Sequence, residues 1–392
     1  MPTGRETGQI RRTQILAAAF ALAHTNERWS LAEVAERIGV SKTAIYRHFK
    51  NRAEIETAME DEYRNDLALA IENAEYTPDG VRRALVAFYR EKPGYLNFFM
   101  HNLFSSDGYD HALNEWLKTA SPRVASFMSF LDGCTGEKKR RASTAFLKGY
   151  VSILIASFKE DGKEALQDDL VEVLGTGLKK MKLPSDRRMT ELEKAATIEA
   201  SEVGDGNRLF DAIAAAIREH GITKTTITNI AEKMGTAKSS LYFYYRNKDE
   251  MLGELVKKET DTMIDLIVRR MAPCKTFAEQ IFVAMVVQAN YLLLKPDMFA
   301  VFNWIRYETM RENTKCAHDD FDADRFLKEF HLEDFYPDES DRDRKAIATL
   351  KWAATLSTSI TLHALKEGHG KQEIAQNIRA MLASMINGDK EI

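Results

Sequence analysis

The sequence predicts an all-α protein built from two tandem units, each with a short three-helix head followed by a longer helical body. Three observations support this prediction. Apolar residues recur at i, i+3, i+4 and i+7 along most of the chain, and no sustained alternating strand pattern is present. The 392 residues exceed the size of one typical hydrophobic core. Finally, the second half of the chain repeats the first.

The repeat is clearest near the start of each half. Residues 35–46 read AERIGVSKTAIY, and residues 231–242 read AEKMGTAKSSLY. Further along, the Lys-Pro pair at 92–93 is matched by the Lys-Pro pair at 295–296. Ordered matches across both halves predict a duplication of one ancestral unit.

The domain boundaries follow from the repeat and from a stretch between the copies that begins with proline and ends with glycines. We expect heads at 1–53 and 207–249, bodies at 54–181 and 250–392, and a linker at 182–206. The middle of the linker is rich in Glu and Ala and favours a short, semi-rigid helix.

Composition excludes several classes of protein. The chain has 59 acidic residues against 55 Lys and Arg, a formal net charge of -4, so any nucleic-acid contact must use a local basic patch. Its 3 cysteines, Cys134, Cys274 and Cys316, argue against a disulfide framework and for a reducing compartment. The uninterrupted apolar runs are shorter than the ~20 residues that cross a bilayer, and the N-terminus lacks an apolar signal region. We therefore expect a cytoplasmic protein with no membrane partner.

The first head has the start and stop signals of three helices. The first helix covers 10–24. Ser30 and Glu33 have the spacing of a capping box at the start of the second, which ends at Gly39. Ser41 can cap a third helix over 42–49. Two short helices joined by a glycine turn form a helix-turn-helix, whose second helix enters the major groove of DNA.

The second head repeats this arrangement, with Thr226 as a cap and Gly235 at the turn. In both heads the third helix turns apolar residues inward and cations outward. The stretch 37–52 contains basic residues and no acid, and so does the stretch 233–248. Two local cationic stripes in a chain of net charge -4 are the pattern that phosphate contact requires.

At these residues the chain resembles the DNA-binding domain of the TetR/AcrR family of transcriptional regulators. The family pattern includes IAERxGVSKGTLYxHFxxK, which is matched here by 34–52 and by 230–248. In the bodies the resemblance is one of length and layout, and it implies a ligand-binding and dimerisation domain. Two departures stand out: Ala237 replaces the capping Ser41 of the first copy, and Arg52 stands where the family usually has lysine.

The resemblance implies a set of DNA-contacting residues in each head. In the first copy these are Ser41, Lys42, Thr43, Tyr46, Arg47, His48 and Arg52. In the second copy they are Lys238, Ser239, Ser240, Tyr242, Phe243, Tyr244 and Lys248. Two plainer interpretations remain open: the tyrosines at 46 and 242 are packing aromatics, and the cations are an ordinary solvated face.

Family members are normally homodimers, whereas here both heads lie on one chain. The resemblance therefore implies that the last two helices of each copy pair within the chain as a four-helix bundle. We expect these helices over 141–159 and 164–180 in copy 1, and over 344–366 and 371–386 in copy 2. Packing within each copy alone is the open alternative.

The middle helices of both bodies are rich in aromatic residues. In this family such helices enclose a small-molecule pocket, so some of these side chains are candidate effector contacts. The candidates are Phe98, Phe99, Trp116, Phe127, Tyr291, Phe302 and Trp304. The alternative for each residue is an ordinary core position.

Signals for metal binding or catalysis are weak. The stretch 316–324 has calcium-loop spacing, but Arg325 replaces the turn glycine and His331 the bidentate glutamate. No nucleophile elbow, phosphate loop or HExxH motif is present. We expect no metal, no cofactor and no enzyme activity.

Together these observations predict a DNA-binding transcriptional regulator, a repressor released by a small-molecule effector, acting as a single-chain pseudo-dimer. Its partners are a double-stranded operator and an effector. The alternative is a ligand-binding or protein-interaction module whose heads no longer read DNA.

Overall fold

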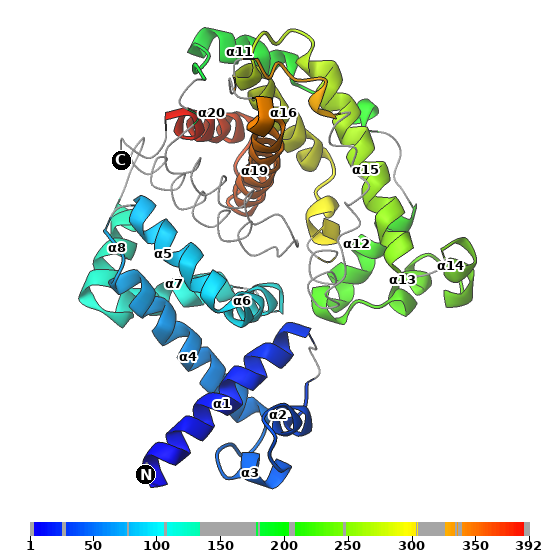
Figure 1. Cartoon of the computed structure of the whole chain (residues 1–392). Helices are drawn as coiled ribbons and strands as arrows, with labels where there is room; N and C mark the ends of the chain where they lie inside the picture. The colour runs from blue at the N-terminus through cyan, green and yellow to red at the C-terminus, as the bar shows by residue number, and fades with distance from the viewer. Residues whose placement is uncertain are drawn as a thin grey trace.

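We describe the fold from a computed structural model of the chain. The described residues are 4–25, 29–76, 78–105, 108–133, 178, 181–203, 208–245, 248–302, 304, 326–333, 335 and 339–387. Every regular element in these ranges is a helix, which confirms the predicted all-α fold. Two separate apolar cores divide the molecule into unit 1, whose core spans 15–128, and unit 2, whose core spans 178–386 (Figure 1).

Head 1 consists of three helices, α1 (Gly4–Thr25), α2 (Leu31–Arg37) and α3 (Lys42–Tyr46). The predicted capping box is confirmed: the Glu33 amide donates to Ser30 Oγ at 3.3 Å, and the Ser30 amide donates to the Glu33 carboxylate at 2.7 Å. The turn glycine, Gly39, has a φ of 68°, which a side chain would disfavour. Helix α3 ends at Tyr46, earlier than the expected 49, and the chain continues as a turn.

The body of unit 1 contains α4 (Arg52–Glu72), α5 (Pro78–Glu91), α6 (Pro93–Ser105), α7 (Tyr109–Ala120) and α8 (Pro122–Gly133). Helix α4 runs from the head into the body (Figure 1). At its middle the fully buried Tyr63 shares a hydrogen bond of 2.8 Å with the hydroxyl of Tyr89. Helix α6 packs against α1, where Phe20 lies 4.5 Å from Tyr95 between ring centroids. The head and the body of unit 1 therefore share one continuous core.

Head 2 repeats head 1 with α12 (Arg208–His220), a 3-10 turn η2 (Ile222–Lys224), α13 (Ile227–Lys233) and α14 (Lys238–Tyr244). Thr226 caps α13 as predicted, since its hydroxyl accepts the Asn229 amide at 3.3 Å. Gly235 has a φ of 64°, matching the turn of head 1. The two heads therefore have the same local construction.

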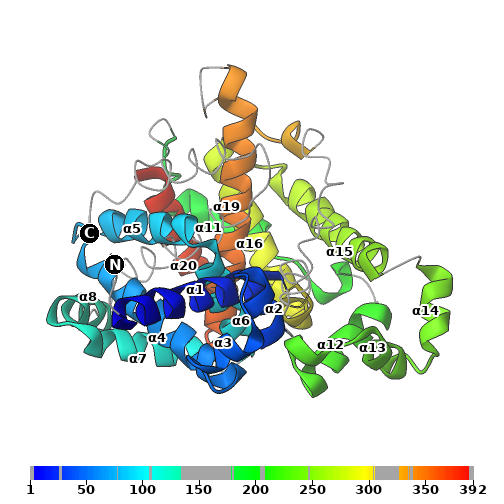
Figure 2. The same ribbon diagram turned by 60° about the horizontal axis from the view of Figure 1, so that its bottom comes forward.

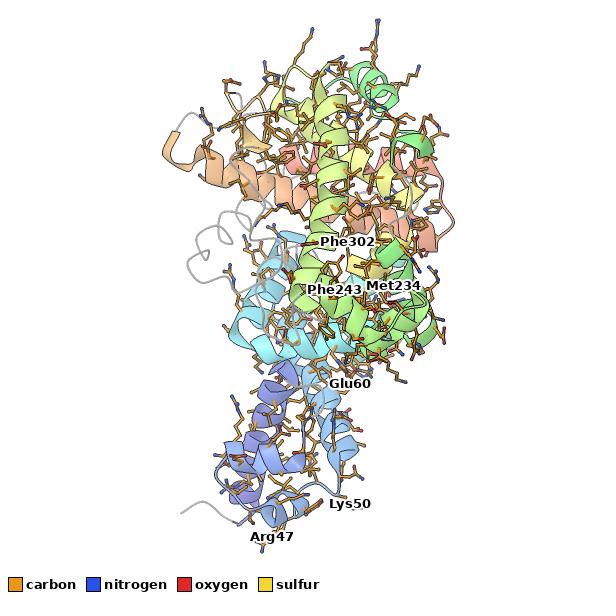
Figure 3. The ribbon with its side chains drawn as sticks, turned by 90° about the vertical axis from the view of Figure 1, so that its right-hand side faces the viewer. Arg47, Lys50, Glu60, Met234, Phe243 and Phe302 are labelled. Carbon is orange, nitrogen blue, oxygen red and sulfur yellow. The ribbon has the colours of Figure 1, made fainter. Side chains whose placement is uncertain are left out.

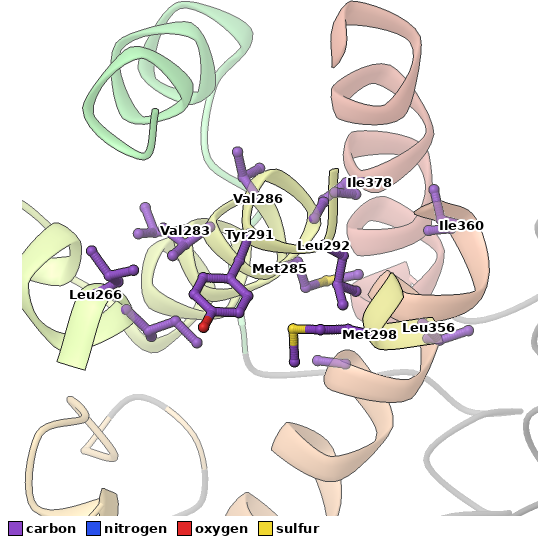
Figure 4. Packing of buried hydrophobic residues seen from close by; sticks show 14 of the residues in the cluster. Leu266, Val283, Met285, Val286, Tyr291, Leu292, Met298, Leu356, Ile360 and Ile378 are labelled. Atoms are coloured by element: carbon purple, nitrogen blue, oxygen red, sulfur yellow. The ribbon is translucent and has the colours of Figure 1, made fainter. Parts of the chain in front are cut away.

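The body of unit 2 is organised around one buried helix, α16 (Phe277–Leu294). It packs against α15 (Lys248–Met271), α19 (Glu339–Lys366) and α20 (Lys371–Asn387), and apolar residues from all four helices interlock in Figure 4. By length and composition α16 is apolar enough to cross a membrane, but 83% of it is buried within the protein. Its apolar character is accounted for by its place in the core of unit 2.

The segment between the units contains the helix that we expected, but it packs onto one unit and does not act as a free linker. Helix α11 (Asp186–Ala195) and the 3-10 turn η1 (Ala200–Glu202) pack onto unit 2, and we call residues 185–203 the strap. Its apolar side chains join the core of unit 2, and they are Met189, Leu192, Ala196, Ile198 and Val203. The strap is therefore part of unit 2. Its apolar side chains lie in the core of that unit, and its charged side chains pair with residues of unit 2 that are distant in the sequence.

Three arginines of unit 2 and of the strap form the polar contacts that hold it. Arg188 donates from two nitrogens to the carboxylate of Glu279, each at 2.9 Å, and Arg270 donates to both oxygens of Glu202, at 2.7 and 2.8 Å. Arg379 of α20 completes the set through Thr190 and Glu193 of the strap. Paired hydrogen bonds between an arginine and a carboxylate fix the relative orientation of the two side chains and also stabilise the contact.

The expected pairing bundle falls only in part within the described residues. The predicted helices over 141–159 and 164–180 lie outside them, while those over 344–366 and 371–386 correspond to α19 and α20, with α19 beginning earlier, at Glu339. Between the units, α6 contacts η2 of head 2. Leu178, which we expected in the body of copy 1, joins the core of unit 2, where its amide donates to the Met385 carbonyl at 3.0 Å. Intramolecular pairing of the two repeats therefore remains a prediction.

Candidate nucleic-acid interface

The first candidate surface is the outer face of α3 in head 1. Ile45 is fully buried beneath it, so the other side of this short helix must face solvent. The exposed side chains are Ser41, Lys42, Thr43, Tyr46 and Arg47, and His48 is half-buried. Figure 3 shows Arg47 and Lys50 at the tip of the molecule, pointing away from the rest of the chain.

The cations of this surface are open to a ligand. Lys42, Arg47 and Lys50 are exposed, and none forms a salt bridge with another residue in the described part of the chain. The ammonium group of Lys42 lies 5.9 Å from the ring centroid of Tyr46. Exposed cations that are not neutralised by an acidic side chain are the groups that phosphate contact needs.

Two of the predicted residues in head 1 also have structural roles. The Ser41 hydroxyl accepts the amide of Ala44 at 3.3 Å and so caps α3. Arg52, which we expected to hold a phosphate, is turned back onto the head: its guanidinium lies 4.7 Å from the Trp29 ring centroid and donates to the Trp29 carbonyl at 3.1 Å. It also pairs with Glu56 at 2.7 Å. The guanidinium thereby fixes the loop before α2 against α4.

The second candidate surface is the outer face of α14 in head 2. Leu241 is buried, and on the opposite side Lys238, Ser239, Tyr242 and Phe243 are exposed. Ser240 is half-buried. The side chains of Tyr244 and Lys248, also predicted to contact DNA, lie outside the described residues.

Several cations in the described part of head 2 have partners within the protein. Lys233 pairs with Glu219, and this pairing lowers the pKa of the Glu219 carboxyl. Arg218 pairs with Asp297, and Arg208 donates to the Met234 carbonyl at 2.7 Å. The outer face of α14 carries two exposed aromatic side chains: Tyr242 is 43% exposed and Phe243 is 84% exposed. The two heads therefore share a scaffold but differ in surface chemistry.

The two recognition helices lie apart from one another. Figure 1 shows α3 at the lower end of the molecule and α14 at one side, and Figure 2 shows the same separation after rotation. In Figure 3 the tip that carries Arg47 projects well beyond Phe243. The heads are not arranged in this structure as a side-by-side pair.

The candidate effector residues of the bodies all have packing roles. Tyr291 and Trp304 are fully buried in the core of unit 2, and the Tyr291 hydroxyl donates to Glu259 at 2.9 Å. Phe98 is buried in the core of unit 1. The other candidates are partly buried and pack against the cores, and they are Phe99, Trp116, Phe127 and Phe302. Their contacts agree with the core interpretation, and a role in effector binding remains a prediction.

No group of three or more His, Cys, Asp or Glu side chains that could hold a metal lies within the described ranges. The acidic stretch 316–324 falls outside them. Cys274 is a buried free thiol, and burial raises its pKa to about 12, so it stays protonated and unreactive at neutral pH.

Two helix-turn-helix heads with exposed outer helices define a DNA-binding protein. Comparison with known proteins agrees: the sequence profile of bacterial regulatory proteins of the tetR family matches residues 15–59 and again residues 209–255. The chain therefore contains two tandem units, each beginning with a tetR-type helical DNA-binding domain.

A curated protein also matches part of the chain. Over 90 residues, 23% of this chain, the sequence is 27% identical to the fatty acid metabolism regulator protein of Bacillus subtilis (strain 168). The alignment covers 45% of that protein, less than half of its length.

Proposed function

We propose that this chain is a repressor that binds a specific operator through both heads and is released by a small-molecule effector. The observation that carries the proposal is the presence of two heads with the same construction, each with an exposed recognition helix, on one chain. A helix-turn-helix homodimer places two such helices on two half-sites. A single chain with two heads has the parts to do the same without a second copy.

The open cations of head 1 support contact with phosphate. Neutralised phosphates release counterions, so affinity should fall steeply with salt, by a factor of roughly 10³ or more between about 50 and about 200 mM for a protein with many phosphate contacts. The test is fluorescence anisotropy with duplex DNA from upstream of the gene at these two salt concentrations. Salt-dependent binding supports the proposal, and no binding at about 1 μM favours the interaction module.

The separated heads are relevant to regulation. If both heads contact one operator, the arrangement in Figure 1 must change, so at least two head arrangements exist. An effector that binds one arrangement more tightly shifts the equilibrium between them. Helix α6 is a candidate element for this coupling, because it contacts both α1 of head 1 and η2 of head 2.

We place the effector site in the bodies, and a thermal-shift screen is the means to find it. Fatty acids are the first class of probe, because the curated relative is named a fatty acid metabolism regulator. A ligand that raises the melting temperature and weakens operator binding supports the repressor. Cytoplasmic location is part of the proposal, since an operator-binding protein must reach the chromosome.

A further inference from the structure

The recognition helices α3 and α14 share one construction. Their N-caps have the same backbone, with φ -74° and ψ 150° at Ser41, and φ -75° and ψ 148° at Ala237. Each helix then has one buried aliphatic residue, a lysine, and a tyrosine one turn later. The lysine lies 5.9 Å from the tyrosine ring centroid in both heads. The tyrosines are similarly exposed, at 48% and 43%.

The next position breaks this match. It holds Arg47 in head 1 and Phe243 in head 2. Arg47 follows α3 with helical backbone angles, φ -71° and ψ -19°, and Phe243 lies within α14, so the two side chains leave equivalent points of one scaffold. Both are exposed, and Phe243 is 84% exposed. A phenylalanine this exposed, beside an exposed tyrosine, forms an apolar surface at the centre of a candidate DNA-contacting face.

The chemistry of the two side chains selects different bases. A guanidinium can donate two hydrogen bonds to O6 and N7 of guanine in the major groove. A phenyl ring has no donor or acceptor, and the apolar group that it can pack against in the major groove is the C5-methyl of thymine. Burying that methyl removes apolar surface of both partners from water.

We propose that the two heads read unlike half-sites: head 1 reads guanine through Arg47, and head 2 reads a thymine methyl through Phe243. The proposal rests on the proposed DNA binding and deepens it, because it makes the DNA target asymmetric. A homodimer with identical recognition helices favours a palindrome, whereas the two recognition helices of this chain differ in charge at the outward position held by Arg47 and Phe243.

The first test removes the methyl group alone. Duplexes selected from random DNA by the full chain are remade with uracil in place of thymine in one half-site at a time. Loss of one methyl contact is expected to weaken binding about fourfold in the half-site of head 2. The same substitution in the half-site of head 1 should have no effect. Phe243→Ala should bind the thymine and uracil duplexes equally.

The second test changes the base preference of one head. Phe243→Arg gives both heads the same side chain, so random-DNA selection with this variant should return a symmetric, guanine-containing site. Arg47→Ala should lose roughly 5- to 150-fold on the wild-type site, through the guanine half-site only. Lys238→Ala is the matched control, because loss of a phosphate contact weakens binding to all sequences without changing base preference.

The outcomes separate this proposal from the proposed function. Salt-dependent DNA binding with a perfect palindrome, or with no response to uracil, overturns the asymmetric reading and leaves the regulator intact. Unchanged base preference in Phe243→Ala also overturns it, and favours a protein partner on the surface of Tyr242 and Phe243. Absence of any DNA binding overturns both proposals. Circular dichroism of each variant checks that the exposed substitutions leave the fold unchanged.

Discussion

At the scale of single residues, two arginines of head 1 that are close in sequence have different roles. Arg47 is exposed and pairs with no acidic residue in the described part of the chain, whereas Arg52 stacks on Trp29 and bonds to its carbonyl. Arg52→Ala should therefore lower the unfolding free energy of head 1 by about 1–2 kcal/mol. Arg47→Ala should change stability by less than about 0.5 kcal/mol. Hydrogen exchange of the backbone amides of head 1 measures the stability change in both variants.

The conservative variant sharpens this test. Arg52→Lys keeps a cation beside Trp29 but loses the fixed fork of donors that reaches both the carbonyl and Glu56. The unfolding free energy of head 1 in this variant should lie between the values for the alanine variant and the wild type. Equal exchange rates in all three proteins would show that Arg52 has no role in holding the loop.

At the scale of elements, α14 lacks a side-chain cap. Ala237 has the same backbone angles as the capping Ser41, so a serine fits there without strain. Ala237→Ser should stabilise α14 by about 1 kcal/mol, and Ser41→Ala should destabilise α3 by a similar amount. Amide exchange over 238–241 should slow about fivefold in the first variant. Unchanged exchange in Ala237→Ser would contradict the capping argument.

The strap is the second element with a testable role. Arg188→Ala leaves the carboxylate of Glu279 without its two donors and should cost roughly 2 kcal/mol of unfolding free energy in unit 2. Arg187→Ala is the control, because its side chain is 91% exposed and its ion pair among the described residues is with Glu191 of the same helix. Urea unfolding at constant pH should separate the two variants, and equal midpoints would mean that the strap adds no stability.

Docking of the strap should also depend on pH. The Arg188 guanidinium lowers the pKa of Glu279, and the Glu199 amide together with Arg270 lowers that of Glu202. A carboxyl with a lowered folded pKa contributes stability above its unfolded pKa of about 4.3, and this stability is lost as the pH falls through the lower, folded value. Urea midpoints measured from pH 7 down to pH 3 should therefore fall, less steeply in Glu279→Gln. An equal fall would exclude this pair as a cause.

The elements also show where sequence reasoning succeeds and where it stops. The capping box at Ser30, the turn at Gly39 and the cap at Thr226 were predictable, because each depends on residues within a few positions of one another. The strap was not predictable, because Arg188 and Glu279 are 91 residues apart and only tertiary packing brings them together. For the same reason the exposed cations of head 1 were predictable, and the fold-back of Arg52 onto Trp29 was not.

At the scale of the whole molecule, we expect the pairing surfaces of the two units to be buried against each other within one chain. The protein should then sediment as a monomer of 44.6 kDa at micromolar concentration. Sedimentation velocity over a range of concentrations measures this. A stable species of twice that mass at the lowest concentration would show that the repeats pair between chains.

Coupling between effector and operator is also a property of the whole molecule. If an effector weakens operator binding by favouring one head arrangement, the operator must weaken effector binding by the same factor. Titration of the effector with and without saturating operator DNA measures this factor. Unequal factors at equilibrium would exclude a simple two-state linkage.

We infer that one chain supplies both heads for one operator. The most direct measurement is the stoichiometry of the complex, by sedimentation velocity of a labelled operator duplex titrated with the full chain. We expect one chain per duplex, with Arg47→Ala and Lys238→Ala each weakening that same complex. Two chains on each duplex, each bound through head 1 and unaffected by Lys238→Ala, would contradict the single-chain account.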